Sequence, residues 1–438
     1  MKVLVIGGGA REHALCWKLR ESSLLRDLYC APGNPGIGEI ADLVPLAAEE
    51  VHRLADFAEE MRIDLTVIGP ELPLTLGLAD ELAARGLAVF GPSQRAAEIE
   101  GSKVFAKQFM ERHGIPTAPF AVAHSAQEAH AARGRFGWPA VLKADGLAAG
   151  KGVVIAQDAA EFDAAVQAVF EERRFGTSGE RLIIEEFLDG EEVSFMALSD
   201  GTRVLPLPLA KDYKRIGDGD TGPNTGGMGS HSPTGVLPAE TAAAIVESVL
   251  QTTVAGLAAE GRPFIGVLYA GLVLTAEGPR VLEFNARFGD PEAQVILMRL
   301  EDDLLPLLAA GAAGSFDVRR LSFRKEAAAC IVLASPGYPG RPVTGEVIRG
   351  LDRAALLPGV EIFHAGTAQA APATLAAPDD GDVVSAGGRV LSVCALDTDL
   401  RGALKRAYAA VGEIDWPGKV FRHDIGRQLL DRVPLGGS

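Results

Sequence analysis

The chain has 438 residues, of which 47% are hydrophobic and 23% charged, and its length predicts a globular protein of about three domains at roughly 150 residues each. The net charge of −16 argues against a nucleic-acid partner, because contacts to phosphates need a basic surface. Uninterrupted apolar runs are shorter than the ~20 residues of a membrane helix and the N-terminus lacks the cleavage site of a signal peptide, so we expect no membrane partner.

The first hundred residues alternate short apolar strands with helical segments. Residues 2–6 are apolar without alternation, as in a strand buried on both faces, and residues 11–21 have helical spacing. Further strands are expected at 28–30, 65–68 and 88–90, with helices at 49–61 and 78–85. This series predicts an N-terminal doubly wound parallel sheet.

A loop rich in glycine or proline follows each of these strands, at 7–12, 31–36, 69–71 and 91–93. Ligands of doubly wound sheets bind at the carboxyl ends of the strands. The candidate substrate-binding residues there are Gly9, Arg11, Asn34, Pro35 and Glu71. Glu12 stands where a dinucleotide-binding fingerprint needs glycine, although a single phosphate at the helix start beside Arg11 stays open. The alternative is that these loops are only tight connections, since glycine and proline occur in any turn.

The rest of the chain changes pattern. Helices are expected at 102–113, 240–260 and 400–411, and strands at 141–144, 153–156, 181–185, 192–198, 266–274 and 280–285. Residues 211–230 are predicted to be a long glycine loop and residues 365–378 a solvated loop. After residue 325 the chain is β-rich, with strands at 328–333, 360–363, 383–385 and 389–395.

Two lysines flank a glycine-rich hairpin at residues 145–152. Lys143 ends a strand and Lys103 opens a helix, and each can offer a positive charge to phosphate oxygens. The hairpin, which contains Gly150 and Lys151, has unhindered N–H groups that suit anionic oxygens. It lacks the first glycine and the hydroxyl residue of a Walker A loop. A lysine on a buried strand can also simply extend to solvent, which is the alternative.

The strand that enters residues 183–188 is a candidate for adenine recognition. Its extended backbone can present one N–H and one C=O to a base, and Glu192 can accept from ribose hydroxyls. The residues concerned are Glu185, Glu186, Phe187 and Leu188. A strand end with solvated carboxylates is the alternative explanation.

Alternation along residues 281–292 indicates a metal site. Glu283, Asn285 and Arg287 should share one strand face, with Leu282 and Phe284 directed into a core. A carboxylate and an amide oxygen on one face suit Mg²⁺, and an arginine beside them suits a phosphate or a carboxylate. A sheet edge with a surface Glu–Arg pair is the alternative.

Motifs of other catalytic classes are missing from the sequence. It contains neither H-E-x-x-H nor G-x-S-x-G, and no nucleophile stands out, so any chemistry is expected to be direct group transfer assisted by charge. Its four cysteines lie far apart without a C-x-x-C pair, which argues against a zinc cage or a disulfide framework and favours the cytoplasm.

Together these segments resemble the phosphoribosylamine–glycine ligase (glycinamide ribonucleotide synthetase) family of the ATP-grasp superfamily. The matching segments are 8–14 (GGAREHA), 33–36 (GNPG), 69–71 (GPE), 145–153, 218–229 (DGDTGPNTGGMG) and 283–292 (EFNARFGDPE). Departures are few, with Ala10 where glycine is common and Tyr213 where histidine is frequent.

The resemblance implies a multidomain α/β and α+β protein. Its parts would be an N-terminal α/β substrate-binding domain at 1–102, an ATP-grasp domain at 103–322 with a lid subdomain near 121–188, and a β-rich domain at 323–438. ATP would lie between two sheets, with residues 181–188 along the adenine. The hairpin at 145–152 and the loop at 212–229 are the candidates for closing over the substrates and excluding water.

The implied reaction joins glycine to 5-phosphoribosylamine and gives glycinamide ribonucleotide, ADP and phosphate in purine biosynthesis, through an acyl phosphate of glycine. The resemblance gives catalytic roles to Arg287, Lys214 and Asp212, adds Asn224, Gly226 and Asp290 to the substrate-binding set, and places Mg²⁺ (or Mn²⁺) on Glu283 and Asn285. It implies small-molecule substrates and a monomer or weak dimer. Two alternatives stay open: an ATP-grasp ligase or carboxylase for another acid, and a nucleotide-binding or NAD-dependent protein built on the first domain.

Overall fold

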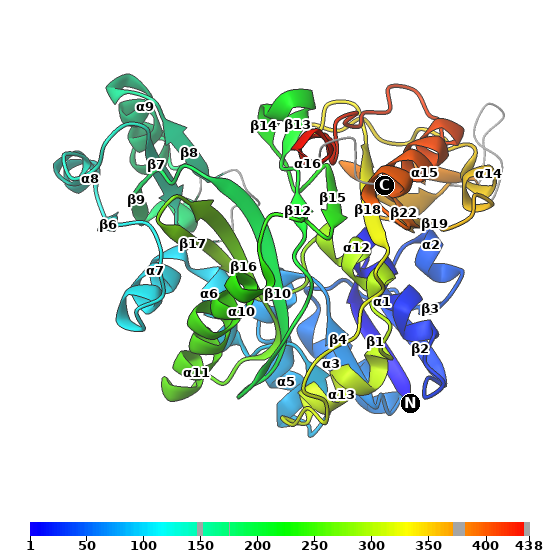
Figure 1. Cartoon of the computed structure of the whole chain (residues 1–438). Coiled ribbons are helices and arrows are strands. Elements are labelled where there is room, and N and C mark those ends of the chain that lie inside the picture. The colour runs from blue at the N-terminus through cyan, green and yellow to red at the C-terminus, as the bar shows by residue number, and fades with distance from the viewer. Residues whose placement is uncertain (147–151, 175, 371–381, 433–438) are drawn as a thin grey trace.

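The computed structural model describes residues 1–146, 152–174, 176–370 and 382–432 (Figure 1). The predicted N-terminal sheet is confirmed. It is parallel, in the order β3-β2-β1-β4-β5. Its strands are β1 (Lys2–Gly7), β2 (Asp27–Pro32), β3 (Asp42–Leu43), β4 (Leu65–Ile68) and β5 (Val89–Phe90). Its helices are α1 (Ala10–Arg20), α2 (Pro35–Gly38), α3 (Val51–Glu60), α4 (Glu71–Thr75), α5 (Leu78–Ala84) and α6 (Gln94–Gly101). The strand order reverses between β1 and β4, which opens a crevice at their carboxyl ends.

A small antiparallel sheet forms a separate layer at the upper left of Figure 1. Its order is β6-β9-β7-β8, from β6 (Phe120–Ala123), β9 (Leu182–Glu186), β7 (Ala140–Ala144) and β8 (Val153–Ala156). Helices α8 (Ala126–Arg133) and α9 (Ala159–Phe170) pack on it around a core of its own that includes Phe162. Helix α7 (Lys103–Arg112) leads into this layer and begins where the Ser102 hydroxyl accepts from the Phe105 N–H at 3.0 Å.

The central antiparallel sheet has the order β11-β10-β16-β17. Its strands are β10 (Glu191–Asp200), β11 (Val204–Pro206), β16 (Ile265–Thr275) and β17 (Gly278–Asn285). Residues Leu272 and Gly271 of β16 pair with Val281 and Glu283, so Leu282 is an extra residue in a β-bulge. The expected alternation is therefore wrong at two positions: Leu282 lines a cleft instead of entering a core, and the strand ends before Arg287.

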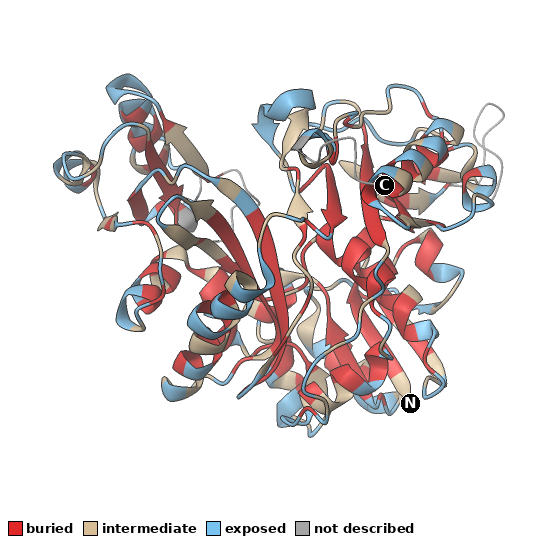
Figure 2. Ribbon diagram, in the orientation of Figure 1, coloured by how far each residue is buried: buried red, intermediate tan, exposed pale blue. Residues whose placement is uncertain are grey.

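One long helix covers this sheet. It consists of α10 (Ala239–Ile245), a π-helical turn (Val246–Gln251) and α11 (Thr252–Ala259). Within the described residues it is the one helix that is long and apolar enough to span a membrane, and its mean hydropathy is 1.4. The expectation from uninterrupted apolar runs did not reveal this helix, because polar residues interrupt its sequence. Val249, Leu250 and Leu257 are buried in the same core as Leu268 of β16, and Figure 2 shows exposed residues along the outer side. The helix is therefore the outer layer of a folded core.

The C-terminal part is built on a sheet with the order β12-β15-β18-β22-β19 (upper right in Figure 1). Its strands are β12 (Lys211–Asp212), β15 (Gly229–Ser232), β18 (Ala327–Ala334), β19 (Val360–His364) and β22 (Arg389–Asp397). The helices around it are α12 (Glu292–Arg299), α14 (Leu351–Ala355), α15 (Leu400–Glu413) and α16 (Arg427–Arg432), whereas α13 (Leu304–Ala312) packs against β5, β10 and β16. Helix α12 contacts both this sheet and α1, which joins the C-terminal layer to the N-terminal domain. All four cysteines are buried and unpaired.

The loop prediction at 211–230 is wrong, and the one at 365–378 is wrong at residues 367–369, which form a strand. Residues 211–230 contain β12, the hairpin of β13 (Arg215–Gly217) and β14 (Thr221–Asn224), and the start of β15. Backbone pairing with strand β18, distant in sequence, builds this segment, so its glycine content hides the strands. In the segment 365–378, β20 (Thr367–Gln369) pairs with β21 (Val383–Ser385), while residues 371–381 lie outside the described residues.

Candidate active site

A cleft of about 1080 Å³ lies where the N-terminal loops, the small sheet, the central sheet and the C-terminal part meet. Most of the residues predicted from the sequence line it: Arg11, Glu71, Lys103, Lys143, Glu185, Glu186, Phe187, Leu188, Glu192, Asp212, Lys214, Asn224, Gly226, Glu283, Asn285, Arg287 and Asp290. Gly9, Asn34 and Pro35 are not among the lining residues, and Gly150 and Lys151 lie outside the described residues.

At the small-sheet end of the cleft, lysines surround one buried carboxylate. Glu185 forms ion pairs with Lys143 and with Lys107, the second at 2.5 Å. Burial lowers the pKa of Lys107 to about 8 even though Glu185 opposes this. Lys103 donates to the Gly146 carbonyl at 2.6 Å. The lysines are thus held by the protein on the wall that faces the cleft, where they can meet an anionic ligand.

Glu283 and Asn285 supply oxygen atoms to the same cleft. Burial would raise the pKa of Glu283, but the ammonium groups of Lys214 and Lys143 lower it below its usual value. Within the described residues the Glu283 carboxylate has no hydrogen bond or ion pair, and the Asn285 Oδ1 accepts one long bond of 3.4 Å from Arg287. An ionised carboxylate and a largely free amide oxygen fit Mg²⁺. No group of three or more His, Cys, Asp or Glu side chains in the described ranges forms a closed metal cage, so further ligands would have to come from a substrate or water.

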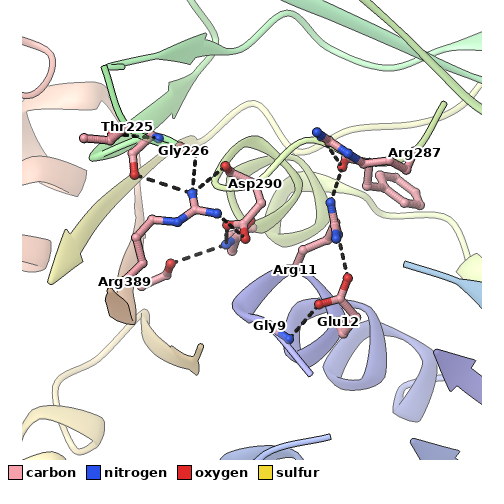
Figure 3. A network of polar contacts seen from close by, with 12 residues as sticks. Gly9, Arg11, Glu12, Thr225, Gly226, Arg287, Asp290 and Arg389 are labelled. Carbon is pink, nitrogen blue, oxygen red and sulfur yellow. Dashed lines mark hydrogen bonds and ion pairs between the residues drawn. The ribbon is translucent and has the colours of Figure 1, made fainter. Parts of the chain in front are cut away.

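Two arginines converge on one carbonyl oxygen at the N-terminal wall (Figure 3). Arg11 and Arg287 both donate to the Phe288 carbonyl, at 3.0 and 3.1 Å. Arg287 also pairs with Glu71 at 3.3 Å and with Glu100 at 3.2 Å. Burial would raise the pKa of Glu71, but the guanidinium of Arg287 keeps it below its usual value. This arrangement fixes Arg287 in the cleft as a permanent cation.

The loops after β1 and β2 differ from the prediction. The Gly9 N–H donates to Glu12 at 2.7 Å and so does not offer a free donor to a phosphate at the start of α1. The Asn34 side chain accepts from the Ile37 N–H at 3.0 Å and donates to the carbonyls of Gly8 and His364, at 3.0 and 2.8 Å. Asn34 therefore caps a helix and ties loops together, which agrees with the alternative that these loops are tight connections.

Arg389 connects the C-terminal sheet to this wall (Figure 3). It donates to the Asp290 carboxylate at 2.9 Å and to the Asp290 carbonyl at 2.7 Å, and also to the Gly226 carbonyl. The Gly226 N–H in turn donates to the Tyr338 hydroxyl at 3.0 Å. The predicted residues Asp290 and Gly226 are thus brought together by Arg389, which lies 99 residues after Asp290 and 163 residues after Gly226.

The β13–β14 hairpin is anchored by the C-terminal segment. Arg422, whose side chain is 0% exposed, pairs with Asp220 and with Asp424, both at 2.7 Å. Tyr213, at the base of the hairpin, accepts from the Gly426 N–H at 2.9 Å. Lys214 reaches the cleft and pairs with Glu192 at 2.7 Å. These contacts hold the hairpin against the C-terminal segment as one wall of the cleft, and closure of this segment over the substrates stays a prediction.

Asp212 and Glu292 both line the cleft, and they are close enough for their charges to interact. Glu292 accepts from the Tyr269 hydroxyl at 2.6 Å and from the Ser194 hydroxyl at 2.8 Å. The Asp212 Oδ1 is buried and has no hydrogen-bond partner in the structure. Burial and the neighbouring charge of Glu292 raise the pKa of Asp212 well above its usual value.

Sequence reasoning missed several charged residues of this site, among them Lys107, Glu100, Glu292 and Arg389. Lys107 follows Lys103 by one helical turn, a spacing that places both on one face and that pattern analysis can detect. Glu292 is the last residue of the segment 283–292, which resembles the ligase family. Glu100 and Arg389 stand in no motif, since only the packing of distant elements brings them to the cleft.

Comparison with known protein families divides the chain into three domains that agree with the observed fold. The phosphoribosylglycinamide synthetase N domain matches residues 1–100, the ATP-grasp (A) domain residues 101–293, and the C domain residues 328–428. The chain belongs to the phosphoribosylglycinamide synthetase family. This confirms the family and the multidomain ATP-grasp fold expected from the sequence.

The chain has relatives that match it over nearly its whole length. Phosphoribosylamine–glycine ligase of Brucella melitensis is 48% identical over 432 residues, and that of Mesorhizobium japonicum 49% over 432 residues, each with 99% of both chains covered. A crystal structure of phosphoribosylamine–glycine ligase from Thermotoga maritima matches with a TM-score of 0.83 at 34% identity, covering 97% of this chain and 100% of that one. A biotin carboxylase domain from Hydrogenobacter thermophilus, with a TM-score of 0.72 and 18% identity, shares the fold.

Proposed function

We propose that this chain joins glycine to 5-phosphoribosylamine at the expense of ATP and gives glycinamide ribonucleotide, ADP and phosphate. The observation that carries the proposal is a single cleft in which lysines, an oxygen pair and an arginine face one another, in a chain that shares family and full length with phosphoribosylamine–glycine ligases. The domain limits 1–102, 103–322 and 323–438, with a lid near 121–188, remain part of the proposal. The family ranges support the division into three domains, and the separate small sheet supports the lid.

ATP would lie between the small sheet and the central sheet. Residues 185–188 line the cleft at the end of β9, where the backbone can read the adenine and Glu192 can accept from the ribose. Lys103 and Lys143 would offset the negative charge of the phosphates. The glycine hairpin, including Gly150 and Lys151, is assigned to the phosphates on its sequence alone.

Mg²⁺ (or Mn²⁺) would be held by Glu283 and Asn285, with phosphate oxygens completing its ligands. The ion supplies charge neutralisation to the transferred phosphoryl group when it is bound. Lys214 lies close enough to Glu283 for its positive charge to favour the ionised carboxylate. This keeps Glu283 ready as a ligand at neutral pH.

The chain's own residues orient the reacting groups. Arg287, fixed by Glu71 and Glu100, would hold the glycine carboxylate against the γ-phosphate, so that this carboxylate attacks phosphorus and ADP leaves. The amine of phosphoribosylamine then attacks the carbonyl carbon of the resulting acyl phosphate and releases phosphate. Arg11, Asn224, Gly226 and Asp290 line the part of the cleft proposed for the ribose phosphate. Gly9, Asn34 and Pro35 would support this part from behind rather than touch the ligand.

The proposal is tested by an ADP-release assay with purified protein. Turnover should require glycine, phosphoribosylamine, ATP and Mg²⁺ together, and mass spectrometry should identify glycinamide ribonucleotide. ADP release with bicarbonate in place of glycine would instead support a carboxylase, and tight NAD binding without ATP turnover a dinucleotide-binding protein. A cytoplasmic monomer or weak dimer that acts on small molecules remains our prediction.

A further inference from the structure

Two lysines share one buried carboxylate on the wall of the cleft. Glu185, in β9, is 1% exposed, and its two oxygens meet different cations. Its Oε1 contacts the ammonium of Lys143 in β7, and its Oε2 lies 2.5 Å from the ammonium of Lys107 in α7. One negative charge is thus opposed by two positive charges, and this part of the wall is positive only while both lysines are present.

The two lysines differ in their other contacts. Lys107 donates to the Thr117 hydroxyl at 2.7 Å, and that hydroxyl donates to a backbone carbonyl of β17 at 2.6 Å. Lys143 donates at 3.2 Å to the carbonyl of Leu282, the extra residue of the β-bulge, and it lies two residues before the glycine-rich hairpin at 145–152. Apart from the shared carboxylate, Lys107 is therefore tied to the protein by shorter bonds, while Lys143 leads into the hairpin assigned to the phosphates.

A nucleotide phosphate and Glu185 compete for the same ammonium, because the carboxylate cancels the charge that Lys143 would offer to a phosphate. If Lys143 turned away from Glu185 and no other cation were in reach, the carboxylate would stay buried without a partner, which is strongly unfavourable. Lys107 removes this penalty, because its ammonium contacts the second oxygen and has an anchor of its own. Burial lowers the pKa of Lys107 to about 8, so this lysine is still mostly protonated at pH 7.

We propose that Lys107 is a positioning residue that neutralises Glu185 so that Lys143 is free to bind the nucleotide phosphates. This assignment rests on the proposed function, in which ATP lies between the small sheet and the central sheet, and it adds a residue that this function leaves without a role. Lys107 itself makes no contact with the phosphates in this arrangement. Its effect reaches them only through the charge of Glu185 and the orientation of Lys143.

The test compares two probes that differ in their phosphates. AMPPNP is an ATP analogue that resists hydrolysis, and adenosine has no phosphate group. In Lys107→Met, the dissociation constant of AMPPNP with Mg²⁺ at neutral pH should rise at least about 10-fold, while that of adenosine should stay within about twofold of the wild-type value. Calorimetry measures AMPPNP directly and adenosine by competition. Lys405→Met, which removes an exposed lysine from α15, is the matched control and should change neither value.

A second substitution separates an effect through Glu185 from a direct one. In the double variant Lys107→Met/Glu185→Gln the carboxylate charge is gone, so Lys143 is no longer neutralised and the affinity for AMPPNP should return to within about threefold of the wild-type value. The double variant replaces a buried ion pair by neutral groups, and so provides a folded protein if the single variant is unstable. A double variant that binds AMPPNP as weakly as Lys107→Met would overturn the proposal, because Lys107 would then act on the phosphates directly.

Two further outcomes would contradict the assignment. Equal losses of affinity for AMPPNP and adenosine in Lys107→Met would show that Lys107 maintains the shape of the whole pocket. Unchanged affinity for AMPPNP would show that Glu185 needs no second cation when a nucleotide binds. Failure of the proposed function is recognised separately, as a wild-type protein that binds no AMPPNP or that releases no ADP when glycine and phosphoribosylamine are both present.

Discussion

Arg389 of β22 and Asp290 at the start of α12 form an ion pair of 2.9 Å, about a hundred residues apart in the chain. The same guanidinium donates to the Asp290 carbonyl at 2.7 Å and to the carbonyl of Gly226 in the segment between β14 and β15. One side chain thus joins the C-terminal sheet, the segment after β17 and the segment after the β13–β14 hairpin. The C-terminal part is therefore a structural component of the cleft and not an appendage to it.

This ion pair should be measurable as a coupling energy. Arg389→Gln and Asp290→Asn should each lower the free energy of unfolding by about 2 kcal/mol, because each leaves a partly buried charge without its partner. The double variant should lose less than the sum of the two, by about 1 kcal/mol or more. Thermal unfolding of the four proteins checks this, and strictly additive losses would show that the contact contributes nothing.

The sequence was sufficient for the parts of this fold that local pattern determines. Residues 2–6 have no polar position, so a buried parallel strand was the expected result, and Lys103 opens a helix because Ser102 caps it. It was insufficient where distant segments decide the structure. Arg389 and Glu100 reach the cleft only through packing, and β12 and β15 form because β18, about a hundred residues away in the chain, offers a free edge. A bulge at Leu282 likewise cannot be seen in an alternating pattern.

Glu283→Gln tests the metal site. The amide keeps the shape of the carboxylate but loses its charge, so we expect turnover to fall about 100-fold and the Mg²⁺ concentration for half-maximal activity to rise about 10-fold. ADP release measured across a Mg²⁺ titration gives both values. The melting temperature should fall only slightly, since the Glu283 carboxylate has no hydrogen bond or ion pair among the described residues and loses only the favourable charges of Lys214 and Lys143. A normal Mg²⁺ dependence would remove Glu283 from the set of metal ligands.

Arg422→Gln tests the anchoring of the hairpin. The wild-type guanidinium is completely buried and bridges Asp220 in the hairpin to Asp424 in the C-terminal segment. Its loss leaves two carboxylates without their cation, so the free energy of unfolding should fall by about 3 kcal/mol. Hydrogen exchange should accelerate at residues 215–224, and turnover should decrease because Lys214 lies next to the hairpin. Exchange rates equal to those of the wild type would mean that the hairpin is held in another way.

The pH dependence of stability should report on His13. The His364 N–H donates to the His13 Nδ1 at 2.9 Å, which requires a neutral acceptor, and burial lowers the pKa of His13 to about 3. An unfolded histidine has a pKa near 6.5, so between about pH 6.5 and 3 the unfolded chain binds more protons than the folded one. Stability from this group is therefore complete above pH 6.5 and decreases by up to about 1.4 kcal/mol per pH unit as the pH falls through that window. His13→Asn keeps an acceptor atom but cannot take up the proton, so its unfolding free energy, measured by denaturant titration from pH 7.5 to 4.5, should depend less steeply on pH than that of the wild type. Parallel curves for the two proteins would show that His13 does not carry this dependence.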